Sequence, residues 1–446
     1  MIELISSIPL VGGFLSSVLP FIVVIGIVVF IHEFGHYIVG RWCGIHAEVF
    51  SLGFGKEIFN RVDKRGTRWR IGILPLGGYV KFLGDADASS RTDLSAVEFM
   101  DDDTLARSFP GASLWKRALT VVAGPVANFI LTIVIYLGLV TWTGVAVDEA
   151  RIGEIPASVA GETPLIQGDL VLAVNGQPVE SFGDLATAVS EVEDGLPVTL
   201  DVERSGTPLE LEVANLRPPY VAGVRPLSAA SRAGIRSGDL LLSAGGQALP
   251  DIAMLQQVVQ ASEGQPLEIV LRRGADTLTL EMVPTEEDVP QPDGTFARQV
   301  IIGVSVTTYL QPQVRSPGPI EALTISVDRM VGIITGTFDG IGQMISGNVS
   351  PTNLQGPLGI AQVSGESAGQ GLVNFILLIA MISTAIGLMN LFPIPVLDGG
   401  HLVFYAIEAV TGRVPAGKWV DVAMAVGLAM VLSLMLFATY NDITRL

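Results

Sequence analysis

A five-residue motif near the start of the chain has residue types and a spacing that suit metal-dependent hydrolysis. Residues 32–36 read His-Glu-Phe-Gly-His. On a helix, residues four apart lie on one face, so both imidazoles reach the same metal ion. Glu33 lies beside them and can take a proton from a metal-bound water. Since the chain has only four histidines, about 0.002 such motifs are expected by chance, and we interpret His32 and His36 as ligands and Glu33 as the general base.

A catalytic zinc ion usually has three protein ligands and one water, so a third ligand must come from elsewhere. His46 and Glu48 lie beyond the apolar stretch that contains the motif, whereas Asp398 and His401 lie at the end of a later one. Asp398 belongs to Asn-Leu-Phe-Pro-Ile-Pro-Val-Leu-Asp-Gly-Gly, residues 390–400. The two prolines break a helix, and irregular backbone at membrane depth is tolerated only where it lines a cavity. We therefore favour Asp398 over His401.

Composition places these residues in a membrane. Hydrophobic residues make up 49% of the chain and charged residues 16%, against about 25% charged in soluble proteins. This excludes a disordered protein and a fully soluble enzyme, and a net charge of −18 gives no basic footprint for nucleic acid. We predict an α-helical polytopic membrane protein in contact with the lipid bilayer, with four transmembrane helices at about 14–40, 118–143, 372–392 and 420–440.

Basic residues predict the orientation of these helices. Residues 41–117 hold 12 of the 26 lysines and arginines, and Arg413 and Lys418 lie between the third and fourth spans. Both loops are expected on the cytoplasmic side. The two termini and residues 148–318 then face outside, with the active site towards the cytoplasm. The first span lacks the basic flank of a cleavable signal peptide, and a single cysteine, Cys43, excludes an intramolecular disulfide.

The outer segment contains an internal repeat. Gly168-Asp169-Leu170 recurs 70 residues later as Gly238-Asp239-Leu240. Each copy predicts a strand, a helix and a further strand, at 170–174, 183–191 and 197–204, and again at 240–244, 252–261 and 266–273. The copies resemble bacterial PDZ domains, which bind extended peptides by strand addition. Two inserted α+β PDZ-like domains, 148–219 and 220–290, therefore either bind peptides or act as a steric shield. The 24 acidic and 10 basic residues of 148–318 indicate a solvated surface.

The remaining segments complete the expected organisation. Residues 1–147 form an N-terminal membrane part and residues 367–446 a C-terminal one. Between the repeats and the third span, 291–366 is expected to be a linker with an amphipathic helix at about 319–346. That helix could lie on the membrane surface, pack under the repeats or simply connect. In the first loop, residues 68–82 alternate in polarity and turn at Leu76-Gly77-Gly78, which favours a β element.

Three motifs on three successive spans resemble the site-2 protease family of intramembrane zinc metalloproteases. They are residues 32–36, the Ala-Gly-Pro-Val-Ala-Asn of 123–128 and residues 390–400. The resemblance covers essentially the whole chain, including two PDZ-like domains between spans two and three. It implies that His32, His36 and Asp398 hold Zn²⁺, that Glu33 is the general base and that Asn390 helps to hold the substrate backbone.

The resemblance also implies a membrane-associated β element that pairs with extended substrate. Its candidate residues are Gly53, Gly55, Gly72 and Ile73. The alternative is a cytoplasmic hairpin without a substrate role.

The resemblance further implies a setting and a substrate class. The setting is regulated intramembrane proteolysis in the bacterial inner membrane, of the kind that serves the sigma-E stress response. The partners are transmembrane substrate helices of anti-sigma factor type, already trimmed outside, and signal-peptide remnants. The outer domains would exclude substrates with bulky outer parts.

Three alternatives remain at this stage. A non-catalytic scaffold could bind peptides through the PDZ-like domains, but it has no reason to bury Glu33 among apolar residues. Another membrane protease with the same short motif would take its third ligand elsewhere. A zinc transporter would need polar residues along the whole path, and the outer halves of the spans are apolar.

Overall fold

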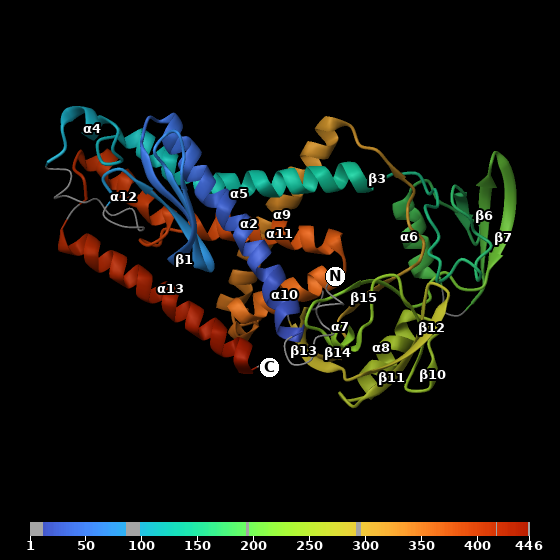
Figure 1. The fold of residues 1–446 in the computed structure, drawn as a ribbon. Coiled ribbons are helices and arrows are strands. Elements are labelled where there is room, and N and C mark those ends of the chain that lie inside the picture. Colours follow the sequence, from blue (N-terminus) through green and yellow to red (C-terminus); the bar gives the residue numbers. More distant parts are fainter. Residues whose placement is uncertain (1–11, 86–98, 193–195, 291–295, 416, 445–446) are drawn as a thin grey trace. The chain divides into compact units, whose positions relative to one another are not determined.

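The computed structural model describes residues 12–85, 99–192, 196–290, 296–415 and 417–444. The chain forms two compact units (Figure 1). The first contains the residues up to Gly138 and those from Ile320 onwards, and the second contains Leu139–Pro319. The first unit is therefore made of two segments, separated in the sequence by the whole of the second unit.

Four helices of the described residues are long and apolar enough to cross a membrane. They have mean hydropathies of 2.2 or 2.3 over their most apolar windows. Even the shortest, with 19 residues, is about 28 Å long at ~1.5 Å per residue, close to the thickness of the hydrocarbon core. The prediction of four spans is thus confirmed. The helices are α2 (Gly12–Trp42), α5 (Leu114–Thr143), α11 (Leu372–Asn390) and α13 (Lys418–Thr444).

Small and polar residues let α2, α5 and α11 pack closely. A Cβ atom at Gly35 of α2 would overlap the backbone of Ala123 in α5, so the two helices touch at this point. The hydroxyl of Ser383 in α11 donates to the carbonyl oxygen of Asn128 in α5 at 2.9 Å. Such contacts replace the hydrophobic driving force that helices lack in lipid, and they bring the motif-bearing face of α2 against α5.

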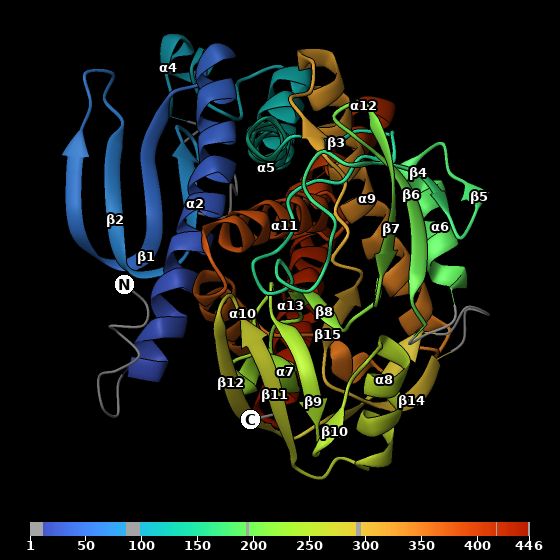
Figure 2. The same ribbon diagram turned by 90° about the vertical axis from the view of Figure 1, so that its right-hand side faces the viewer.

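The first loop forms an antiparallel sheet from two long, bent strands, β1 (Ala47–Val62) and β2 (Arg68–Phe82). The first half of β1 has a neighbour on each side: Leu52 pairs with Gly78 and also with Ile71. The second half of β2 pairs on one side only within the described chain, and it forms an edge of the sheet. Figure 2 shows the sheet beside α2. The expected β element is therefore present.

Four further helical segments lie in the C-terminal part of the chain. In α9, Ala322 and Ser326 are buried, while Ile320 and Ile345 are exposed, and the three expectations for this helix remain open. Asp442 of α13 accepts hydrogen bonds from the backbone N–H groups of Gly356 and Gly359, both at 2.9 Å, and so caps α10. The segments are α9 (Pro319–Ile345), the 3₁₀ turn η1 (Pro351–Asn353), α10 (Pro357–Gly369) and α12 (Asp398–Thr411). The first loop adds the short α4 (Asp102–Ala106).

The second unit contains the two repeats as two α+β folds. The first has the sheet order β5-β4-β6-β7 beside helix α6, and the second has the order β12-β11-β9-β8-β15 beside helix α8. The first comprises β4 (Leu170–Val174), β5 (Gln177–Pro178), α6 (Phe182–Glu191), β6 (Val198–Arg204) and β7 (Thr207–Val213). The second comprises β8 (Tyr220–Val224), α7 (Ala229–Ala233), β9 (Leu240–Ala244), β10 (Gln247–Ala248), α8 (Ile252–Ala261), β11 (Leu267–Arg273), β12 (Asp276–Met282) and β15 (Val304–Thr307). Their assignment as PDZ-like domains stays a prediction.

Each repeat carries the same ion pair between a buried aspartate and a partly exposed arginine. Asp169 accepts two hydrogen bonds from Arg204, both at 2.8 Å, and Asp239 accepts two from Arg273, at 2.8 and 2.7 Å. Burial alone would raise the pKa of Asp169, but the hydrogen bonds from Arg204 and from the Ile166 N–H outweigh it and lower that pKa. The aspartate of the repeated Gly-Asp therefore accepts the hydrogen bonds that link the start of one strand to the end of the next long strand, β4 to β6 in the first repeat and β9 to β11 in the second.

The second repeat is inserted into the first. Tyr309 and Leu310, which follow β15, are buried in the core of the first repeat, and the Tyr309 hydroxyl donates to Oγ1 of Thr163 at 3.0 Å. The segment expected as a linker from residue 291 thus also contains strands. Besides β15, these are β14 (Phe296–Ile301), which pairs with β13 (Thr285–Pro290), and β16 (Val314–Arg315), which pairs with β3 (Val145–Ala146). The unit consequently begins and ends at one pair of strands.

Candidate active site

Three ligand atoms from two distant parts of the sequence converge in the first unit. Nε2 of His32 lies 3.2 Å from Nε2 of His36. Oδ2 of Asp398 lies 3.2 Å from the first of these nitrogens and 3.4 Å from the second. Among the described residues that could supply metal ligands, this group contains Asp398 and does not contain His401.

The group fits a zinc ion by geometry and by chemistry. Ligands at about 2.0–2.1 Å from a tetrahedral zinc ion lie about 3.3 Å from one another. Oδ2 of Asp398 is buried and receives no hydrogen bond, an arrangement that is costly for a carboxylate unless a cation meets it. Two imidazoles and one carboxylate are a donor set of catalytic zinc sites, in which a fourth position stays open for water or substrate.

Helix α2 presents both histidines on one face, and α5 orients the second of them. Nδ1 of His36 donates to the backbone carbonyl oxygen of Thr120 at 2.9 Å. A proton on Nδ1 leaves the lone pair on Nε2, the atom that faces His32 and Asp398. Gly124, one turn after Thr120, has no side chain, and a Cβ atom there would overlap the His36 imidazole. The close approach of α5 therefore depends on a glycine.

The break after α11 places Asp398. The helix ends at Asn390, and Pro393 and Pro395 cannot continue it. Cβ atoms at Gly399 and Gly400 would overlap the backbone of this irregular segment. The two glycines let the first turn of α12 fold back against the segment, so Asp398, the first residue of α12, faces α2.

A second contact fixes the far end of α12. Arg117 of α5 donates to Glu408 of α12 at 2.6 Å, and both side chains are largely buried. The Arg117 guanidinium also lies 5.1 Å from the centre of the Tyr405 ring. A buried pair of this kind is strongly orienting, since removing either partner leaves an unpaired charge. It holds α12, and with it Asp398, against the helix that contacts His36.

A cavity of about 200 Å³ opens on the ligand atoms. Glu33 lines it beside the two histidines, and β2 forms another wall. A Cβ at Gly78 would lie 3.1 Å from Cγ of Glu33, so this glycine lets the strand lie against α2. The cavity is lined by His32, Glu33, His36, Gly78, Tyr79, Val80, Phe82, Phe109, Thr120, Val121, Asn390, Val396, Leu397, Asp398 and His401.

The other sequence-predicted site residues fall into two groups. Asn390, the last residue of α11, lines the cavity. Gly53, Gly55, Gly72 and Ile73 do not, because they lie where β1 and β2 bend and cross. A Cβ at Gly72 would meet the backbone of Gly53, which indicates that these glycines permit a close crossing of the strands. A substrate role for these four residues stays a prediction without support from the cavity.

Sequence reasoning missed the wall that β2 contributes and the contacts from α5. Tyr79 and Val80 follow the predicted turn at Gly77-Gly78, and that glycine pair was the available signal for close approach to α2. Thr120 acts through its backbone, so its side-chain type carried no signal. Asn128 had one: it is a polar residue in an apolar span, and its amide lies 3.2 Å from Nδ1 of His32.

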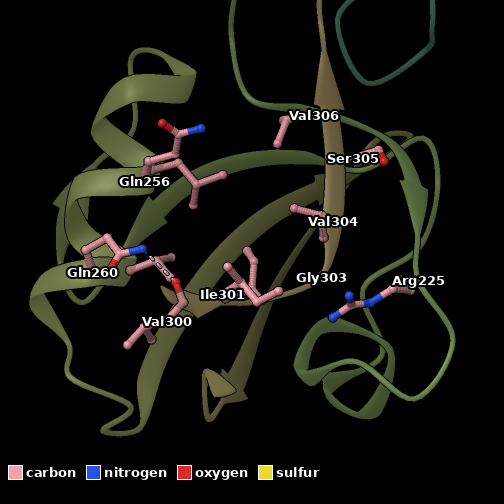
Figure 3. Close-up of a pocket in the computed structure, with 12 residues that line it drawn as sticks. Arg225, Gln256, Gln260, Val300, Ile301, Gly303, Val304, Ser305 and Val306 are labelled. Carbon is pink, nitrogen blue, oxygen red and sulfur yellow. Dashed lines mark hydrogen bonds between the residues drawn. The ribbon is translucent and has the colours of Figure 1, made fainter. Parts of the chain in front are cut away.

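The second unit has a separate cleft of about 310 Å³ in the second repeat (Figure 3). Gln256 and Gln260 of α8 lie on one side and Val304 and Val306 of β15 on the other. In the described chain, β15 ends the sheet and pairs only with β8. An open edge strand beside a helix is a geometry that accepts an extended peptide.

The contact between Gly124 and His36 yields a first prediction. Gly124→Ala should lower the zinc content of the purified protein from about one ion per chain to well below half, because the new methyl group displaces the His36 ring. Metal analysis of the detergent-purified protein measures it. Gly26→Ala in α2 is the matched control, since a Cβ there meets no atom within 4 Å. Full zinc content in Gly124→Ala would contradict the prediction.

Comparisons with known proteins identify the family of the chain. Residues 20–434 match peptidase family M50. The chain is 38% identical over 437 residues to "Putative zinc metalloprotease Atu1380" of Agrobacterium fabrum, with 97% of each chain covered. It is 34% identical over 464 residues to "Regulator of sigma-E protease RseP" of Escherichia coli, with 97% of this chain and 100% of the relative covered. The chain therefore belongs to peptidase family M50, the site-2 protease family of zinc metalloproteases.

Proposed function

We propose that His32, His36 and Asp398 hold the zinc ion with which this enzyme cleaves peptide bonds of membrane-spanning proteins. Membership of its family makes the chain a zinc metalloendopeptidase of site-2 type with a role in regulated intramembrane proteolysis. The observation that carries the assignment of residues is the convergence of three ligand atoms, 3.2–3.4 Å apart, in a cavity that Glu33 also lines.

The chemistry divides between the metal and the side chains around it. Zinc supplies Lewis-acid polarisation of a peptide carbonyl and activation of a water molecule. Glu33 takes the proton of the attacking water on its carboxylate and later delivers it to the leaving nitrogen. Asn390 donates an amide N–H to the developing oxyanion and helps to fix the substrate backbone. Apolar side chains such as Val396 and Leu397 limit the water around these groups and so strengthen their electrostatic interactions.

The proposed substrates are single-span proteins of anti-sigma factor type that have already been trimmed outside, together with signal-peptide remnants. The printed name of the Escherichia coli relative, a regulator of sigma-E protease, supports the first class. The carbonyl groups of a substrate helix are engaged in the hydrogen bonds of that helix. A substrate helix must therefore unwind before its carbonyl groups become accessible.

The edge of β2 is the proposed partner for the unwound substrate. Gly78, Tyr79 and Val80 line the cavity and belong to the half of β2 that pairs on one side only in the described sheet. Unpaired N–H and C=O groups of an edge strand can pair with an added strand. This extends the expected substrate role of the β element to residues nearer Glu33 than Gly72 and Ile73.

The proposed orientation places the termini and the second unit in the periplasm and the active site towards the cytoplasmic side of the inner membrane. The distribution of basic residues supports it, with 12 of 26 in residues 41–117. The second unit would then shield the protease from substrates with bulky outer domains. Its cleft beside β15 supports peptide binding as an additional property.

The proposed ligand set can be tested by measuring zinc binding separately from peptide-bond cleavage. Asp398→Ala should lose most of the bound zinc, whereas Glu33→Gln should retain about one ion per chain and lose cleavage by roughly 10²–10⁴-fold. Zinc analysis and cleavage of a single-span test substrate in detergent measure the two effects. Zinc retained in full by Asp398→Ala would show that the third ligand is another residue, and His401→Ala would be measured next.

The role of β2 gives a prediction about the edge strand beside the cavity. Tyr79→Pro, which disrupts this strand where it lines the cavity, should lower the cleavage rate about tenfold or more without loss of zinc. Ile58→Pro is the comparison, because Ile58 is exposed on the opposite edge of the same sheet and lies outside the cavity. Wild-type cleavage by a folded Tyr79→Pro protein would contradict pairing at this edge.

Shielding can be tested by removing the second unit at its own boundary. Val314 pairs with Ala146, so a short Gly-Ser turn can replace residues 147–313 and keep β3 paired with β16. This variant should cleave test substrates with and without a bulky folded outer domain, whereas the full chain should cleave only the trimmed one. Glu33→Gln in the shortened chain controls for contaminating proteases. Unchanged selectivity after the deletion would rule out shielding.

A further inference from the structure

Asn128 is a polar side chain placed against a metal ligand but outside the ligand set. It lies in α5 and is fully buried. Its Nδ2 atom is 3.2 Å from Nδ1 of His32, and its Oδ1 atom is buried without a hydrogen-bond donor. A buried amide oxygen normally has a donor, so the side chain as placed satisfies only part of its hydrogen-bonding capacity.

The position of His32 sets a requirement on its other nitrogen. Nε2 of His32 is the atom that faces His36 and Asp398. To bind a metal through Nε2, a neutral imidazole must carry its proton on Nδ1. That proton needs an acceptor in a buried environment, and the amide oxygen of Asn128 can accept it, whereas the amide nitrogen cannot.

The other histidine shows the same requirement already met. Nδ1 of His36 donates to the backbone carbonyl of Thr120 at 2.9 Å. Thr120 and Asn128 are eight residues apart on α5, about two helical turns, and so lie on the same face. A backbone carbonyl and a side-chain amide of one helix therefore face the Nδ1 atoms of the two histidines.

We propose that Asn128 is a positioning residue that accepts the Nδ1–H of His32 through Oδ1 and thereby holds the Nε2 lone pair towards the metal. A half-turn of the amide exchanges Oδ1 and Nδ2 in place and meets both needs: the ring proton gains an acceptor, and Oδ1 gains a donor. With Nδ2 towards the ring, the amide would instead favour the tautomer with its proton on Nε2, which cannot bind metal. The inference rests on the proposed function, since it takes His32 as a zinc ligand.

A purely structural role for Asn128 predicts different behaviour. The hydroxyl of Thr132 donates to the carbonyl oxygen of Ala380 in α11 at 3.0 Å, and the backbone carbonyl of Asn128 accepts a hydrogen bond from Ser383 in α11 at 2.9 Å. A side-chain substitution leaves that carbonyl in place. Loss of the amide oxygen should therefore act on zinc binding more than on the packing of the helices.

The test is the zinc dissociation constant of the full-length, detergent-purified protein, measured by competition with a chelator. Asn128→Leu, of similar volume without an acceptor, should weaken zinc binding by about 10–100-fold. Asn128→Asp, which keeps an acceptor oxygen, should stay within about threefold of the wild type. Thr132→Val is the matched control, being buried one turn further along α5 without contact to His32 in the described structure, and it should stay within about twofold.

Each outcome either supports or overturns the proposed role of Asn128. A tenfold or larger loss in Asn128→Leu, with affinity retained in Asn128→Asp, supports the proposal. Affinity within twofold in Asn128→Leu overturns it, and so does an equal loss in both variants, which would show that the shape of the amide matters and its acceptor does not. If Asn128→Leu fails to elute as a folded protein, Asn128→Ala replaces it under the same criteria. A wild type without zinc would instead refute the ligand set of the proposed function.

Discussion

The convergence of His32, His36 and Asp398 is the constraint on which the rest of the membrane unit depends. Ionisable groups at the centre of a spanning helix cost roughly 2.5–3.5 kcal/mol each on insertion scales. A cluster of them beside Glu33 persists only if each polar atom has a partner. The glycines at the α2–α5 contact, the carbonyl of Thr120 and the buried Arg117–Glu408 pair all bring such partners within reach. Residues that are far apart in the sequence thus meet one local requirement, which is to provide partners for the buried polar atoms of the site.

The same constraint explains why one span is broken and why a β-sheet lies beside the site. Peptide groups in a hydrocarbon environment must be hydrogen-bonded within the protein. The irregular segment between α11 and α12 is tolerated because it lines the cavity with Val396 and Leu397. A substrate that leaves its helical state exposes peptide groups in turn, and an edge strand supplies partners for them. The irregular segment between α11 and α12 and the edge of β2 thus both relate to the need of peptide groups for hydrogen-bond partners where water is scarce.

Features with a local cause could be predicted from the sequence, and features that depend on long-range contacts could not. The apolar stretches predicted all four spans, and the repeat predicted β4 and β9 with their observed bounds. The i, i+4 spacing of His32 and His36 and the proline-rich segment before Asp398 predicted three residues that the structure brings together. The return of Tyr309 into the core of the first repeat has no local signature in the sequence. The strands that close the unit, β3 and β16, are two residues long and about 170 residues apart, so their pairing leaves no pattern either. The wall formed by Tyr79 and Val80 was missed because the bend of a strand depends on its neighbours.

Helix α5 shows how an element without any proposed ligand can determine a metal site. Thr120, Gly124 and Asn128 follow one another at intervals of four residues and so form a stripe on one face. Each meets α2 in a different way: a carbonyl accepts from His36, a missing side chain admits the His36 ring, and an amide reaches His32. The motif at residues 123–128 is therefore explained by what its glycine and asparagine do to two imidazoles on another helix. Because α5 contacts the ring nitrogens of both histidines, a substitution on α5 should alter the geometry of the metal site although no proposed ligand lies on that helix.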